Sequence, residues 1–251
     1  KSSTFALKFE IRNLMKRFLS IFVIGLMAVS AMAADLPKQG FGLQIGYAQP
    51  TLRLNSPNIL YPKDSLVNTT QLHGLKVGVV YDGSFIKGFG SSIGINYTFA
   101  TTNTPWSAKN LIGEYPKVRN QYFYHQIEVF VDWQYKFEIA KETYLMLYTG
   151  PTIQYGIALK QRVQEDLYGT VSISETIDRY GKESQNTDLR QFNVTWGVGA
   201  GFQYQRYFLR GGYDFGLINP YKNEQFYGMD RNTRGRFDQW EIKIGAYLWY
   251  E

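Results

Sequence analysis

The chain is 251 residues long, contains 20 Tyr, 17 Phe and no Cys, and has a formal net charge of +6. This length allows one large β domain, and a chain without Cys can form no disulfide and use no thiol chemistry. The mean hydropathy of -0.30 excludes a bundle of membrane-spanning helices, whereas many aromatics at low hydropathy are typical of a transmembrane β-barrel, whose strands are apolar on one face only.

Most of the net charge lies at the start of the chain. The first 33 residues carry five basic side chains and one acidic one, which contribute +4 of the +6. The remaining +2 is too balanced to predict a nucleic-acid partner or a polybasic membrane patch.

The N-terminal region has the pattern of a secretory signal peptide. Met15-Lys16-Arg17 precedes the apolar run 18–29, and Ala31-Met32-Ala33 follows it as an A-x-A cleavage site. The apolar run is short for a spanning helix, which needs ~20 residues, although a buried or anchoring helix is an alternative. We therefore expect 1–14 to be an upstream artefact, 15–33 a cleaved signal peptide and 34–251 the mature domain.

Eight segments alternate apolar and polar residues with the two-residue period of a β-strand. In the longest of them, odd positions such as Ile127 and Trp133 are apolar, and even positions such as Glu128 and Lys136 are polar. The predicted strands are 41–48, 75–82, 92–99, 119–137, 145–157, 192–204, 207–217 and 239–250.

The connections between these segments alternate between long and short. The short links are 83–90, 138–142 and 205–206, and the long polar loops are 55–70, 101–118, 160–190 and 219–236. Part of the third long loop, 170–177, alternates again and is expected to extend a hairpin beyond the membrane. This pattern predicts an all-β, eight-stranded antiparallel up-and-down barrel with periplasmic termini and short turns and with extracellular long loops.

Alternation alone does not say which face of the strands points into the barrel. A lipocalin-like carrier in water would place the apolar face inside, whereas a transmembrane barrel would place it against lipid. Three features favour lipid outside: the polar set is rich in Gly, Ser, Thr and Gln, aromatics gather at strand ends, and the last strand ends in aromatics. The soluble carrier remains an alternative.

The signal peptide, the Gly/aromatic alternation and the closing strand Ile242-Lys243-Ile244-Gly245-Ala246-Tyr247-Leu248-Trp249-Tyr250 together resemble a known family. The pattern is similar to the small outer-membrane β-barrels of the OmpX/OmpA-like type, often labelled porin family, over 34–251. Chains of this family often end on Phe as an assembly signal, whereas this one ends on Tyr250-Glu251.

The resemblance implies a location in the outer membrane of a Gram-negative bacterium. It also implies contact with the lipid bilayer and lipopolysaccharide, insertion by the barrel-insertion machinery, and a monomeric state. The expected function is a structural or loop-mediated binding role toward an extracellular ligand or protein, with at most minor transport and no catalysis.

An eight-stranded barrel has an interior that side chains can just fill. By strand parity, seven charged residues point inward, three positive and four negative, and we expect them to form a salt-bridged plug. They are Lys76, Glu128, Asp132, Arg210, Asp214, Glu241 and Lys243. Asp214 and Lys243, on neighbouring strands, are the pair expected to bond; a hydrated lumen is the alternative.

Catalytic chemistry has little support in the sequence. His73 and His125 both fall on the apolar face near the loop-side strand ends, as interfacial residues would. The competing hypothesis is a lipid-modifying acyl hydrolase or transferase, which needs a nucleophile beside an oriented base; neither His has a Ser beside it in sequence, although Ser92 or Thr70 could approach in space.

Other candidate sites lie in the loops. Two separated His do not predict a metal site, the acidic residues of the third loop lack Ca²⁺-loop spacing, and no cofactor is expected. Arg and aromatic residues of the fourth loop suggest a binding surface, although a solvated loop tip is the plainer interpretation. This surface comprises Phe226, Tyr227, Arg231, Arg234 and Arg236.

Overall fold

The computed structural model describes residues 39–54, 69–86, 88–108, 117–180, 189–220, 224–226, 229–231 and 235–250. The upstream residues 1–14 and the predicted signal peptide 15–33 lie outside these residues. In the described part of the chain, all regular structure is β. Its residues include no helix with the length and apolar character needed to cross a membrane.

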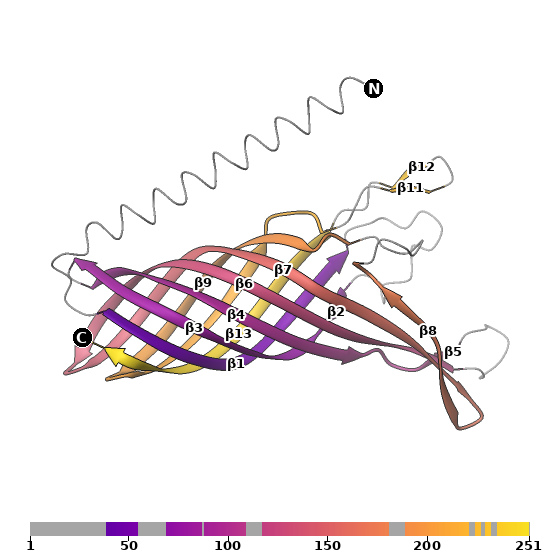
Figure 1. The fold of residues 1–251 in the computed structure, drawn as a ribbon, viewed down its shortest axis with the longest axis horizontal. Coiled ribbons are helices and arrows are strands. Elements are labelled where there is room, and N and C mark those ends of the chain that lie inside the picture. The colour runs from indigo at the N-terminus through magenta and orange to yellow at the C-terminus, as the bar shows by residue number, and fades with distance from the viewer. Residues whose placement is uncertain are drawn as a thin grey trace, which may run out of the picture.

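Eight long strands form the body of the molecule (Figure 1). They are β1 (Gln39–Leu54), β3 (His73–Ile86), β4 (Phe89–Asn103), β6 (Lys117–Ala140), β7 (Thr143–Leu167), β9 (Phe192–Tyr204), β10 (Tyr207–Gly216) and β13 (Gly235–Tyr250). Five short strands accompany them: β2 (Thr69–Gln71), β5 (Ser107–Ala108), β8 (Thr170–Asp178), β11 (Glu224–Phe226) and β12 (Met229–Arg231).

The eight long strands close into a barrel. In the order β1-β3-β4-β6-β7-β9-β10-β13, each strand pairs antiparallel with both neighbours, and β13 pairs with β1 to complete the ring. Closure satisfies the backbone groups along the wall and leaves the ring without an edge strand. The predicted eight-stranded up-and-down order is therefore confirmed.

The two ends of the barrel differ. At the end where β1 begins and β13 finishes, tight turns join the strands (Figure 1); we call it the turn end. Gly88, Glu142 and Gln205 adopt positive φ there, of 88°, 56° and 53°. We call the opposite end, where β1 finishes and β13 begins and where β8 lies, the loop end.

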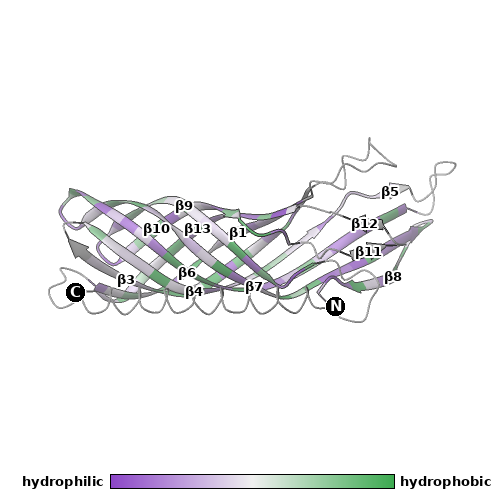
Figure 2. Cartoon of the chain, turned by 90° about the horizontal axis from the view of Figure 1, so that it is seen from above, coloured by the Kyte–Doolittle hydropathy of each residue, from purple (hydrophilic) through white to green (hydrophobic). Residues whose placement is uncertain are grey.

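The barrel is apolar outside and polar inside, because large apolar side chains are exposed on its wall while many polar and charged side chains are buried. Figure 2 shows hydrophobic and hydrophilic residues alternating along its strands. Leu43 is 49% exposed on the outer wall, while its neighbour Gln44 is 4% exposed in the lumen. This orientation decides the question that parity left open. It contradicts the lipocalin-like carrier, which would need an apolar interior.

Aromatic side chains form two girdles on the outer wall, and aliphatic side chains lie between them. The turn-end girdle includes Phe41, Tyr81, Phe89, Tyr135 and Phe137. The loop-end girdle includes Tyr47, Tyr97, Phe99 and Trp240, and the band between them includes Leu43, Ile45, Val77, Ile95 and Leu147.

Strands β6 and β7 extend further than the sequence predicts, and together with β8 they project beyond the ring (Figure 1). Parts of the predicted loops 101–118 and 160–190 are therefore strand, because polar residues pair across them; Arg119 Nε, for example, donates to Gln164 Oε1 at 2.6 Å. The expected hairpin extension is present. Its tip, Tyr168-Gly169, has φ of 52° and 90°, the positive values that a tight primed turn requires.

Candidate functional site

The lumen holds a network of charged side chains. All seven residues that parity predicts to point inward are buried there: Lys76, Glu128, Asp132, Arg210, Asp214, Glu241 and Lys243. At the centre, Lys76 on β3 binds both Glu128 on β6 and Glu241 on β13. Lys243 binds the same Glu241, so two ammonium groups share one carboxylate.

Uncharged amides complete the environment of Glu128. Its carboxylate accepts hydrogen bonds from Asn96 Nδ2 at 2.8 Å, Gln126 Nε2 at 2.9 Å and Gln239 Nε2 at 3.2 Å. A buried carboxylate is costly unless it is paired and hydrogen-bonded. The amides on the same inward face lower that cost, which explains why the polar set is rich in Gln.

A second group forms around Arg210 on β10. Its guanidinium donates to Ser92 Oγ at 2.9 Å and to Gln134 Oε1 at 3.2 Å, and it lies 3.7 Å from Asp132. The same guanidinium lies over the ring of Tyr148, 4.5 Å from the ring centre. One arginine therefore links side chains from several strands across the lumen.

A third group, centred on Lys136 and Asp82, was absent from the predicted network. Lys136 Nζ lies 3.0 Å from Asp82 Oδ2 and donates to Gln203 Oε1 at 2.9 Å, and the Tyr247 hydroxyl donates to the same Asp82 oxygen. Both charged residues occupy polar positions of the alternation. Parity alone would have found them.

The expected ion pair between Asp214 and Lys243 does not form. Strand register places Lys243 opposite Arg210 and Asp214 opposite Gln239. Lys243 instead binds Glu241, which is two residues away on its own strand and shares the inward face. The sequence identified the neighbouring strands but not their register.

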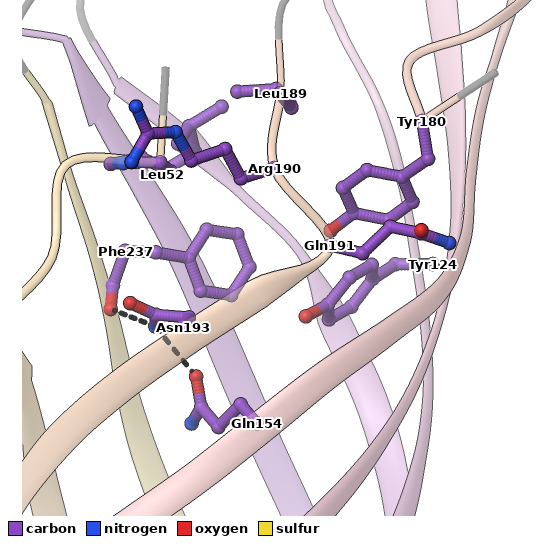
Figure 3. A pocket seen from close by; sticks show the side chains of 10 residues that line it. Leu52, Tyr124, Gln154, Tyr180, Leu189, Arg190, Gln191, Asn193 and Phe237 are labelled. Carbon is purple, nitrogen blue, oxygen red and sulfur yellow. Dashed lines mark hydrogen bonds between the residues drawn. The ribbon is translucent and has the colours of Figure 1, made fainter. Parts of the chain in front are cut away.

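Apolar side chains pack inside the barrel toward the loop end. Leu72, Ala100, Tyr124, Leu159, Leu189 and Phe237 pack into one buried cluster. Figure 3 shows Phe237, Leu189 and Tyr124 around the cavity that remains, with Gln154 and Asn193 below them. This cavity measures about 10 Å³, which is close to the lower limit for a single water.

A second apolar cluster lies inside the barrel toward the turn end. Val80, Phe130, Met146, Phe208 and Tyr247 pack together there. Beyond it lies a vestibule of about 610 Å³, lined by residues that include Tyr144, Arg206 and Tyr250. Along β3, β6 and β13, the central ion pairs of Lys76, Glu128 and Glu241 thus lie between the two apolar clusters.

The predicted loop surface lies mostly outside the described residues. Tyr227 and Arg234 fall outside them, and for Phe226 and Arg231 only the backbone is described, in the β11–β12 pair. Arg236 is described, and its guanidinium binds Asp238.

The two histidines face outward at the loop-end girdle, as predicted. His73 is hydrogen-bonded to Tyr47, and His125 Nδ1 lies 2.5 Å from the Tyr97 hydroxyl. Ser92, one possible nucleophile, lies inside the lumen and is bound by Arg210, so the barrel wall separates it from both histidines. Within the described ranges, no group of three or more His, Cys, Asp or Glu could hold a metal ion.

No protein-family model and no curated protein matches this sequence. Among solved structures, the chain is similar to neisserial surface protein A, with 13% identity, a TM-score of 0.38 and coverage of 84% of this chain and 99% of that one. It is also similar to Ail, the attachment invasion locus protein of Yersinia pestis, solved with the heparin analogue sucrose octasulfate, with 11% identity, a TM-score of 0.37 and coverage of 84% and 99%. The barrel assignment rests on the strand pairings, not on these likenesses.

Proposed function

We propose that this protein is a closed outer-membrane β-barrel of a Gram-negative bacterium, which holds a projecting sheet and loops at the cell surface for binding. It is non-enzymatic and OmpX-like in kind, and its barrel conducts little or no solute. The observation that carries the proposal is a buried, ion-paired lumen inside a wall whose outer face is apolar.

The outer wall supports the membrane location. Transmembrane barrels carry an apolar band between two aromatic girdles at the lipid interfaces, which is the order found here: the turn-end girdle, the aliphatic band and the loop-end girdle. An apolar surface this extensive would be a severe aggregation liability in water.

The filled lumen argues against a porin. Lys76, Glu128 and Glu241 bond across the barrel, and apolar clusters lie on both sides of them. A hydrated ion entering this space would have to break buried ion pairs, which costs several kcal/mol for each charge left unpaired.

The projecting part of the sheet supports a binding role. Beyond the ring, β6, β7 and β8 form a sheet held by regular pairing rather than a loose loop. Leu167, Val171 and Ile173 are exposed on it, where they can contact a partner. A rigid sheet loses less conformational entropy on binding than a flexible loop does.

Two measurements test this function. In planar bilayers, the unmodified protein should show no steady conductance, whereas the K76A/E128A/E241A variant, whose central ion pairs are removed, should show channel events. On cells, a variant in which a tight Asn-Gly turn replaces 164–175 should lose binding to a panel of immobilised glycans and matrix proteins. Steady conductance of the unmodified barrel would refute the closed lumen, and unchanged binding across the panel would refute the binding role.

A further inference from the structure

Two arginines lie directly opposite each other on the outer wall, near the loop end. Arg53 on β1 and Arg236 on β13 are register partners, and both share the outward face with Tyr47 and Trp240. Like charges directly opposite each other destabilise a strand pair. The wall therefore needs a compensating group at this position.

Asp238 supplies that compensation. Its buried carboxylate lies 3.2 Å from Arg53 Nε and 2.8 Å from Arg236 Nε. It also accepts hydrogen bonds from the Tyr213 hydroxyl at 3.0 Å and from the Gly216 amide at 2.9 Å. Four donors hold this one carboxylate, so it fixes the direction of both guanidinium groups.

The cluster keeps an excess of positive charge and unused donors. Two arginines against one aspartate leave a net charge of +1. The Arg53 and Arg236 side chains are 50% and 46% exposed, while that of Asp238 is fully buried. Each guanidinium has five N–H donors; the described contacts use Nε of both arginines and Nη2 of Arg53, which donates to the Tyr213 hydroxyl at 3.2 Å. The N–H groups that these contacts do not use can serve a further acceptor.

The height of the cluster in the wall indicates its ligand. Trp240 lies two residues from Asp238 on the same face, and its ring contacts that of Tyr47, with ring centres 5.7 Å apart. Both rings belong to the loop-end girdle, and such girdles lie at the level of the lipid head groups. Arg53 and Arg236 follow on the side away from the apolar band, where head-group phosphates lie.

We propose that Arg53 and Arg236 bind a phosphate group on the head group of an outer-leaflet lipid, with Asp238 as their positioning residue. The guanidinium fork matches the geometry of phosphate oxygens and forms charge-assisted hydrogen bonds with them. This site rests on the proposed function, because that function places the loop end of the barrel at the outer leaflet of the membrane.

The test measures lipid retention with a defined probe. The barrel is folded into phosphatidylcholine vesicles that contain diphosphoryl lipid A or the same lipid without its phosphates, and lipid bound after extraction is counted by native mass spectrometry. The unmodified protein should retain the phosphorylated form preferentially. R53Q/R236Q should weaken this preference by about tenfold or more, since a charge-assisted contact contributes roughly one factor of ten.

Matched controls separate the possible outcomes. K141Q/R206Q removes two exposed positive charges at the turn end and should leave the preference unchanged. Single R53Q, which keeps the bond between Arg236 and Asp238, should give an intermediate loss and serves if the double variant does not fold. Equal retention of both lipids, or no effect of R53Q, would overturn the site. Displacement by inorganic phosphate as effective as that by lipid A would overturn the lipid assignment.

Insertion is measured separately in vesicles of phosphatidylcholine alone. A protein that floats with these vesicles but shows no phosphate preference would refute this site and leave the proposed function intact. A protein that does not float with them would refute the proposed function itself.

Discussion

Lys76 and Lys243 lie at the same level of the barrel wall, on either side of Gly46, and both bind the carboxylate of Glu241. Gly46 on β1 is the register partner of each lysine. Because it has no side chain, the backbone of β13 packs closely against it, with the Ile242 carbonyl group and Cα of Lys243 in the space that a Cβ would need. Lys76 reaches past β1 to Glu241 on β13. The network therefore depends on a glycine as well as on charged residues.

Replacing Lys76 with Met should destabilise the barrel by about 3–5 kcal/mol, the usual cost of breaking a buried ion pair by removing one partner. The variant leaves Glu128 without a bound cation and Glu241 with Lys243 only. Urea unfolding in lipid vesicles measures the free-energy change. K243M should cost less, because Glu241 keeps Lys76, and the exposed K160M should change stability by at most ~0.5 kcal/mol. Equal stability of K76M and the unmodified protein would mean that the lumen is hydrated rather than bonded.

Gly46→Ala should disrupt the seam between β1 and β13. A Cβ at this position would clash with the carbonyl oxygen of Ile242 and lie 2.7 Å from Cα of Lys243, so backbone must move. Overpacking of this kind costs about 1–3 kcal/mol. Gly83→Ala is the matched control, because its added Cβ would meet nothing closer than 3.8 Å. The folded fraction is read from the heat-dependent shift in electrophoretic mobility, and similar fractions for the two variants would contradict this role of Gly46.

Sequence periodicity predicted the barrel because the strand period of two is imposed by backbone geometry, and the strands of the barrel repeat the same division into an apolar outer face and a polar inner face. The same period placed all seven predicted charges in the lumen. It could not predict their partners, since register depends on turn geometry and on pairing along the whole strand. For example, Lys243 was expected to pair with Asp214 but pairs with Glu241.

The extensions of β6 and β7 were harder to predict for a different reason. Beyond the ring the strands no longer enclose a lumen, so the apolar pattern fades, while cross-strand bonds such as that between Arg119 and Gln164 continue the pairing. The sequence did not predict the Arg53–Asp238–Arg236 cluster either. Nothing in the spacing of Arg53 and Arg236 shows that closure of the ring makes them register partners.

Asp82 and Lys136 should be energetically coupled. Their 3.0 Å ion pair is buried near the turn end, and the Tyr247 hydroxyl binds the same carboxylate. In a double-mutant cycle of D82N, K136M and D82N/K136M, the coupling free energy should be about 1–3 kcal/mol, the range for contacting charged groups. Urea unfolding supplies the four stabilities. Additive effects, with no coupling beyond ~0.5 kcal/mol, would show that water rather than Lys136 solvates Asp82.

Single cysteines should report the orientation of the barrel without interference, because the natural sequence has no Cys. Thr170 at the hairpin tip and Lys141 in a turn-end connection are both exposed. If the loop end faces the outside, a membrane-impermeant maleimide should label T170C on intact cells and should label K141C only after the outer membrane is permeabilised. Labelling of both sites in permeabilised cells controls for thiol reactivity. Labelling of K141C but not T170C on intact cells would invert the barrel, and would also place Arg53 and Arg236 at the inner leaflet.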